Sequence, residues 1–116
     1  MAKHSDPLLD SLFTALSDPT RRAIIARLAE GPAAVKELAA PHPMALSSFL
    51  KHIAVLERAH LVSTSKKGRV RTCRLNPDAF RPAETWLASR RRQTTVKIDR
   101  LASLLEGMRG GAPDGR

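Results

Sequence analysis

The sequence predicts a mainly α fold with one small β-hairpin and a long C-terminal helix. Its 116 residues suit a single domain, and only 3% are aromatic, so the core must come from Leu, Ile, Val and Ala, as in packed helices. Apolar residues recur at helical spacing through the first half of the chain, and two short strand patterns flank Gly68. After Pro82 no helix-breaking residue occurs before Gly107.

The first two helices have recognisable start and stop signals. A first helix is expected from about Leu8 to Leu16, where Leu and Phe repeat at helical spacing. Ser17-Asp18-Pro19 ends it, and Asp18 is suited to be the N-cap of a second helix with Pro19 in the first turn. Gly31-Pro32 ends that second helix.

Two further helices follow on either side of Pro41-His42-Pro43. The third is short, about 35–40, and the fourth runs over about 45–59. In the fourth helix Phe49, Ile53 and Leu56 fall on one face, which predicts that this face is buried. Its opposite face is therefore available for a partner.

A basic hairpin is expected over about 61–75. The predicted strands are 61–65 and 70–75, and Lys66-Lys67-Gly68-Arg69 forms the turn. From Leu61 through Asn76 the segment contains five cations and no acid. The whole chain carries a net charge of +9, so a polyanion is the expected partner.

A helix from Pro82 to Glu106 would be roughly 37 Å long, more than a domain of this size covers with its own core. An apolar stripe along it suits pairing with a second copy of the chain. The residues assigned to homodimerisation are Leu9, Leu12, Phe13, Leu87, Thr94, Ile98, Leu101 and Leu105. Polar residues 1–7 and the glycine-rich residues 107–116 are expected to be a mobile N-terminus and a disordered tail on either side of a domain spanning 8–106.

Short helices followed by a basic hairpin are typical of the winged helix-turn-helix, with the third and fourth helices as the helix-turn-helix pair. In this arrangement a recognition helix enters the major groove, and the cationic hairpin, or wing, contacts the flanking DNA backbone or minor groove. The fourth helix would be the recognition helix. The sequence therefore predicts double-stranded DNA as the partner.

Three stretches resemble the ArsR-type family of bacterial repressors: 15–28, 35–39 and 50–62. Their most specific parts are Leu-Ser-Asp-Pro-Thr-Arg-Arg at 16–22 and Lys-His-Ile-Ala-Val-Leu-Glu-Arg-Ala-His-Leu-Val at 51–62. The resemblance covers about residues 12–106. It implies a homodimeric, sequence-specific repressor of transcription that binds a near-palindromic operator and is usually released by an inducer.

Matched to the family's recognition helix and wing, the expected DNA contacts are Ser47, Ser48, Lys51, His52, Lys66, Lys67, Arg69 and Arg71. The alternatives are helix capping for the serines and a solvated hairpin for the cations. Ala45 replaces a capping Ser of many relatives, so the helix is expected to start nearer Ser47. His60 replaces a usual Gly at a helix end that needs left-handed backbone, which His tolerates better than most residues.

Several other site types are not expected. No nucleophile, base and orienting acid occur at recognisable spacing, so we expect no enzyme activity and no cofactor. The paired cysteines or terminal-helix His ligands of metal-sensing relatives are absent, so no metal site is expected. There is no signal sequence or membrane-spanning apolar run, which favours a cytoplasmic protein with no membrane partner.

Other questions stay open at this stage. Cys73 is either an inert strand thiol or a redox switch whose thiolate Arg71 and Arg74 would favour. Trp86 is expected in the core, with a ligand pocket as the alternative. A protein-interaction module and a non-specific or RNA-binding protein are the competing functions. The operator, the regulated genes, the inducer and the direction of regulation do not follow from the sequence.

Overall fold

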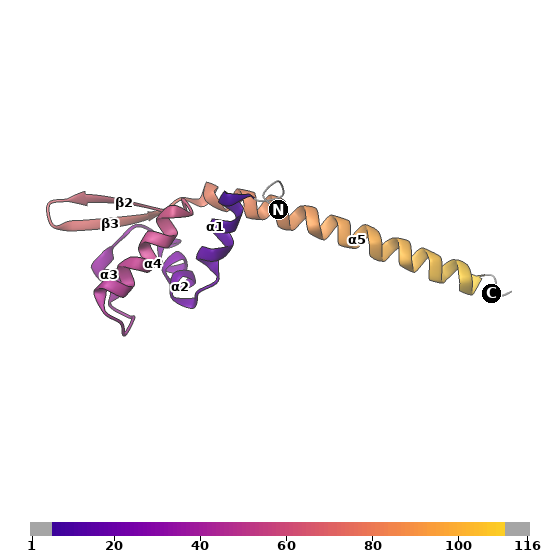
Figure 1. Cartoon of the computed structure of the whole chain (residues 1–116), viewed down its shortest axis with the longest axis horizontal. Helices are drawn as coiled ribbons and strands as arrows, with labels where there is room; N and C mark the ends of the chain where they lie inside the picture. The colour runs from indigo at the N-terminus through magenta and orange to yellow at the C-terminus, as the bar shows by residue number, and fades with distance from the viewer. Residues whose placement is uncertain (1–5, 111–116) are drawn as a thin grey trace. The chain divides into compact units, whose positions relative to one another are not determined.

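The computed structural model describes the backbone of residues 6–110 and the side chains of residues 6–108. These residues fall into two units, divided between Ala83 and Glu84, and each unit is described by itself. The elements, in chain order, are α1 (Pro7–Leu16), α2 (Pro19–Leu28), β1 (Ala33–Ala34), α3 (Val35–Ala39), α4 (Leu46–Arg58), β2 (Val62–Lys67), β3 (Val70–Leu75), a 3-10 helix (Pro77–Phe80) and α5 (Arg81–Gly110) (Figure 1). The predicted fold class, a mainly helical winged helix-turn-helix with a long last helix, is confirmed.

The first two helices begin in the same way, with an aspartate cap followed by proline. The Leu9 N–H donates to Asp6 Oδ1 over 3.2 Å, and the Arg21 N–H donates to Asp18 Oδ2 over 3.1 Å. The prediction that Asp18 caps the second helix is confirmed. Because Asp6 and Pro7 already belong to the start of α1, only residues 1–5 of the expected mobile N-terminus lie outside the described residues.

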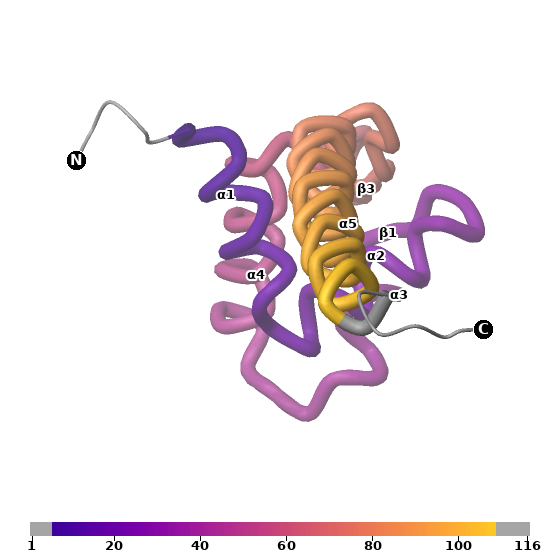
Figure 2. The backbone as a smooth tube through the Cα atoms, turned by 90° about the vertical axis from the view of Figure 1, so that its right-hand side faces the viewer, coloured from indigo at the N-terminus to yellow at the C-terminus, as the bar shows by residue number. Residues whose placement is uncertain are grey.

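The core of the first unit is built on the inward face of α4, which packs against α1 and α2 (Figure 2). The predicted inward residues Phe49, Ile53 and Leu56 are each at most 1% exposed. Leu12 of α1 and Ile24 of α2 are buried with them. Burying a large apolar side chain contributes about 1.5–3 kcal/mol, so this cluster determines how α4 lies on the other two helices.

The wing is longer than expected and belongs to a three-stranded antiparallel sheet in the order β1-β3-β2. β1, which was not predicted, pairs Ala33 with Cys73. Lys67 pairs with Val70, so only two residues, Gly68 and Arg69, form the turn between β2 and β3 (Figure 1). Gly68 has a φ of +61°, a conformation that glycine adopts without steric cost.

Two helix boundaries differ from the prediction. α4 begins at Leu46 rather than near Ser47, with Ala45 at the N-cap and no side-chain cap hydrogen bond. α5 continues past the expected end at Glu106 to Gly110, because the glycine at 107 lowers helix stability by only about 1 kcal/mol and no proline occurs between Gly107 and Gly110. The expected disordered tail is therefore helical over 107–110, and residues 111–116 lie outside the described residues.

His60 follows the end of α4 in the left-handed conformation expected from the sequence. Its φ is +62°, and its carbonyl accepts a hydrogen bond of 3.1 Å from the Asn76 side-chain amide. The side chain itself is exposed. His60 therefore acts here through its backbone, at the point where the chain turns from α4 toward β2.

Changing this position should alter stability according to backbone preference alone. His60→Gly should raise the free energy of unfolding by up to about 1 kcal/mol, because glycine has no Cβ clash at positive φ. His60→Val should lower it by about 1 kcal/mol or more, because a β-branched residue is strained there. Urea denaturation of the full chain measures both values, and equal stability of the two variants would contradict the assignment.

Candidate nucleic-acid interface

α4 presents a polar stripe to solvent on the side opposite its buried face. Ser47, Lys51 and Arg58 are exposed and lie within about 40° of one another around the helix axis, at about 100° per residue. Arg58 was not among the predicted contacts, although its spacing of seven residues from Lys51 on a helix could have identified it. The stripe offers a hydroxyl and two cations, groups that bind phosphates and base edges.

The two predicted serines do not cap α4. The N-cap is Ala45, and Ser47 and Ser48 lie inside the first turn with exposed side chains. The structure therefore does not support helix capping, the alternative explanation for these two serines. Both hydroxyls remain candidates for contact with a partner.

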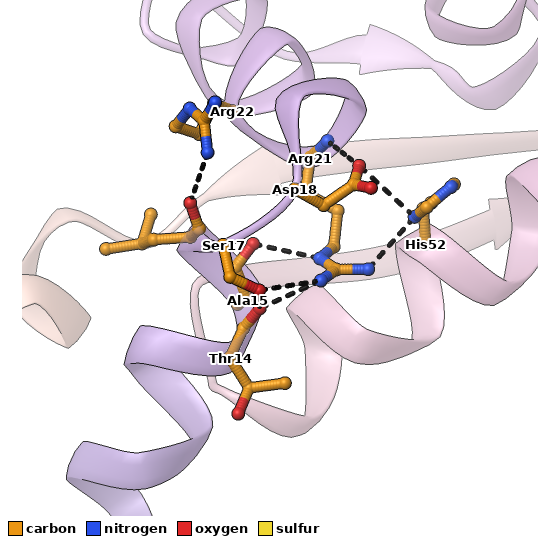
Figure 3. A network of polar contacts seen from close by, with 8 residues as sticks. Thr14, Ala15, Ser17, Asp18, Arg21, Arg22 and His52 are labelled. Carbon is orange, nitrogen blue, oxygen red and sulfur yellow. Dashed lines mark hydrogen bonds and ion pairs between the residues drawn. The ribbon is translucent and has the colours of Figure 1, made fainter.

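His52 lies on a different flank of α4, against the start of α2. Its Nδ1 is 3.1 Å from Arg21 Nη1 and 3.7 Å from Asp18 Oδ2, and its side chain is 21% exposed (Figure 3). Since arginine can only donate, the Arg21 contact requires Nδ1 to be the acceptor and the imidazole proton to sit on Nε2. This geometry gives His52 a contact within the protein that the sequence prediction did not anticipate.

Arg21 is the centre of this network. Its Nε donates to the Ala15 carbonyl over 2.9 Å, and its Nη2 donates to the Thr14 carbonyl over 2.8 Å (Figure 3). These carbonyls belong to the last turn of α1, where helical partners are missing. One guanidinium therefore joins the end of α1, the start of α2 and the flank of α4.

Asp18 completes the network as a carboxylate. Burial alone would raise the pKa of Asp18, but the Arg21 N–H hydrogen bond, the charge that His52 carries when its imidazole is protonated, and the positive charge of Arg21 outweigh it and lower the pKa below its ordinary value. Asp18 therefore keeps its negative charge beside Arg21 and His52.

The wing side of α4 carries a second polar contact. Thr64 Oγ1 donates to Glu57 Oε2 over 2.8 Å, and Arg71 Nη2 lies 3.6 Å from Glu57 Oε1. Arg71, a predicted DNA contact, is thus paired with a carboxylate from α4. The other predicted wing cations, Lys66, Lys67 and Arg69, are exposed around the hairpin turn.

Cys73 is not activated by its cationic neighbours. Burial raises the pKa of its thiol, an effect that the nearby Arg71 opposes and Glu57 reinforces. The residue is 0% exposed and sits in the middle strand of the sheet. Arg71 does favour the thiolate, as expected, but burial outweighs it, so the inert strand thiol is the alternative that fits.

The residues assigned to dimerisation differ in accessibility. Leu12 is fully buried in the core of its own chain, so it is unavailable to a second copy, and this assignment is corrected. Leu9 is partly buried against the same core, whereas Phe13 is 38% exposed. The α5 residues of the predicted stripe, Leu87, Thr94, Ile98, Leu101 and Leu105, are all exposed.

Trp86 is 45% exposed, which overturns its expected place in the core.

Two other kinds of feature are absent from the part of the chain that the structure describes. None of the helices within 6–110 is both long and apolar enough to cross a membrane. Over the same part of the chain, no three His, Cys, Asp or Glu side chains lie together in a way that could hold a metal ion.

The Arg21 network predicts unequal effects for two adjacent arginines. Arg21→Ala should lower the free energy of unfolding by about 2 kcal/mol, because it removes charge-assisted hydrogen bonds to part-buried acceptors on two helices. Arg22→Ala is the matched control, since its Nη1 makes one exposed bond to the Leu16 carbonyl (Figure 3), and should lower it by less than about 1 kcal/mol. Thermal and urea unfolding measure both, and equal losses would refute the linking role of Arg21.

Known proteins resemble this chain in both sequence and structure. A model of the helix-turn-helix domain matches residues 16–64. Over 76 residues the chain is 41% identical to the HTH-type transcriptional regulator Rv2034 of Mycobacterium tuberculosis, an alignment that covers 66% of this chain and 71% of that protein. It is 28% identical over 79 residues to the transcriptional repressor SdpR of Bacillus subtilis, covering 68% of this chain and 88% of SdpR.

Among solved structures, the ArsR family transcriptional regulator RHA00566 superposes with a TM-score of 0.75 and 48% sequence identity. That match covers 78% of this chain and 95% of the other. The helix-turn-helix, the basic wing and these similarities agree: the chain belongs to the ArsR family of winged helix-turn-helix transcriptional regulators.

Proposed function

We propose that this protein is a sequence-specific repressor of transcription that binds a near-palindromic operator as a homodimer. The observation that carries the proposal is the exposed stripe of Ser47, Lys51 and Arg58 on α4, beside a wing whose cations Lys66, Lys67 and Arg69 surround the hairpin turn. α4 would enter the major groove while the wing holds the flanking phosphates. Repression is inferred from SdpR, whose name describes a repressor.

The residues divide into two roles within this surface. Ser47, Ser48 and Lys51 at the start of α4 would reach base edges, because the N-terminal residues of a recognition helix lie deepest in the groove. Lys66, Lys67 and Arg69 would bind phosphates and set affinity for any duplex. His52 and Arg71 would act mainly by positioning α4, since each already contacts a neighbouring element.

A symmetric pair of such surfaces fits the exposed stripe on α5. Leu87, Ile98, Leu101 and Leu105 are each at least 50% exposed and recur at intervals of eleven, three and four residues along one side of the helix. A second copy would cover this stripe, so that residues 8–106 of two chains form one functional unit. The two recognition helices of the dimer would then bind half-sites about 34 Å apart. This binding would take place in the cytoplasm.

Specific binding is tested with the purified full-length protein and fluorescence anisotropy. The probes are the duplex upstream of its own gene, genomic fragments, and a shuffled duplex of equal composition at about 150 mM salt, where non-specific binding is weak. The proposal expects at least one natural fragment to bind about a hundredfold more tightly than the shuffled duplex. Equal affinity for every DNA, or tighter binding to single-stranded RNA, would contradict it.

Variants separate the two roles. Lys51→Ala, or alanine at both Ser47 and Ser48, should cost about 1–3 kcal/mol on the preferred fragment and much less on shuffled DNA. Lys67→Ala or Arg69→Ala should weaken both duplexes alike and reduce the slope of log affinity against log salt by about one per lost phosphate contact. Equal, small effects from all of these changes would refute the assignment of roles.

Glutamate substitutions on opposite sides of α5 test the proposed dimer. Ile98→Glu or Leu101→Glu should raise the dissociation constant of the dimer at least about tenfold, because each places a charge in an apolar seam. Val96→Glu is the matched control: Val96 is 46% exposed but lies roughly opposite the stripe at about 100° per residue. Analytical ultracentrifugation measures all three, and an equal shift for Val96→Glu would place the seam elsewhere.

A further inference from the structure

The first unit contains a groove of about 950 Å³ between α3, the start of α4 and the wing. It lies beside the polar stripe of α4 rather than on it. Leu46 and Leu50, which line the groove, are one helical turn apart on the flank that faces the wing, and Lys51 follows on the neighbouring side. The groove is therefore a separate feature of this surface.

The apolar part of the groove lining is well exposed. Leu46 is 58% exposed and Val70 is 53% exposed, and the partly buried Leu50 lies in the same groove. Each Å² of such surface removed from water contributes about 25 cal/mol, so a molecule that covers these side chains is favoured by the hydrophobic effect. Exposed apolar patches rimmed by polar groups often mark ligand grooves.

The charged residues that line the groove are cations. Lys36 from α3 and Lys66 and Arg69 from the wing line it, and no Asp or Glu occurs among the described residues in its lining. Arg71 also lines it but has Glu57 beside it at 3.6 Å. A ligand that matches both the apolar and the cationic residues of the lining needs an apolar body and an anionic head, and carboxylates form charge-assisted hydrogen bonds with Arg and Lys.

We propose that this groove binds one molecule of a free long-chain carboxylate. The hydrocarbon chain would cover Leu46, Leu50 and Val70, and the carboxylate would bind Arg69 and Lys66. Its volume lies within the roughly 300–1,000 Å³ of typical small-molecule sites. This assignment rests on the groove alone and does not require the protein to bind DNA.

If the protein binds DNA as proposed, binding of the carboxylate would interfere with it. Lys66 and Arg69 cannot serve a carboxylate and a DNA phosphate at once, and a hydrocarbon chain would occupy the space between α4 and the wing. A long-chain carboxylate would therefore compete with DNA and act as an inducer. The competition follows from mass action, since the ligand binds only the DNA-free surface.

The site is tested without DNA by isothermal titration of the full chain with sodium laurate below its micelle-forming concentration. Dodecyltrimethylammonium is the control for the tail, and acetate is the control for the head. We expect saturable binding of one laurate per chain and at least about tenfold weaker binding of both controls, since each lacks one half of the recognition. Equal binding of the cationic detergent would overturn the proposal in favour of general adsorption of apolar tails.

Matched variants locate the site. Leu46→Ser and Arg69→Ala should each weaken laurate about tenfold. The controls lie outside the groove lining: Leu8→Ser, at an apolar residue that is 39% exposed on α1, and Arg74→Ala, at an exposed cation of β3. Both controls should change the affinity less than about twofold. Equal losses in all four variants would place the ligand elsewhere.

The inducer role is tested separately on a DNA fragment that the protein prefers. Laurate should release the wild-type protein from it, whereas Leu46→Ser should remain bound at the same concentration. If laurate binds the groove without changing DNA affinity, the competition is refuted and the site stands. If no DNA is bound specifically, the proposed function fails while the titrations still decide the ligand site.

Discussion

Burial of one face of α4 is the constraint on which the rest of this structure depends. Phe49, Ile53 and Leu56 have almost no exposed surface, and that burial sets the rotation of the helix. Contacts on both flanks then hold it: Arg21 with His52 on the side of α2, and Glu57 with Thr64 on the side of the wing. Only the outward stripe and the edge of the groove remain for a partner.

The sequence was sufficient for features that depend on local patterns. Periodic apolar residues predicted most of the helices, and the Asp18 cap predicted the start of α2. His60 was expected to be left-handed at the end of α4. Each of these signals lies within a few residues of the feature that it predicts. β1 could not be predicted, because Ala33–Ala34 carries no strand pattern and is held only by pairing with Thr72 and Cys73. Its strand character comes from residues about forty positions away.

The candidate site shows the same division between local and distant information. Exposure of Lys51 and of the wing cations followed from helical spacing and charge. The contacts of His52 and Arg71 could not be predicted in this way, because their partners lie on other elements. The burial of Leu12 in its own chain could not be predicted either, because its helical spacing is the same whether it faces its own core or a second chain. The raised pKa of the Cys73 thiol likewise depends on tertiary burial. The apolar groove emerged only when α3, α4 and the wing were placed together.

We infer that α4 and the wing form a single DNA-reading surface. An NMR titration of the isotope-labelled protein with a preferred duplex tests it most directly, because it reports contact residue by residue. We expect the largest changes in amide shift in the first turns of α4, around Ser47 to Lys51, and around the hairpin turn at Gly68. Changes confined to the cationic part of α5 near Arg90, with α4 unaffected, would contradict it.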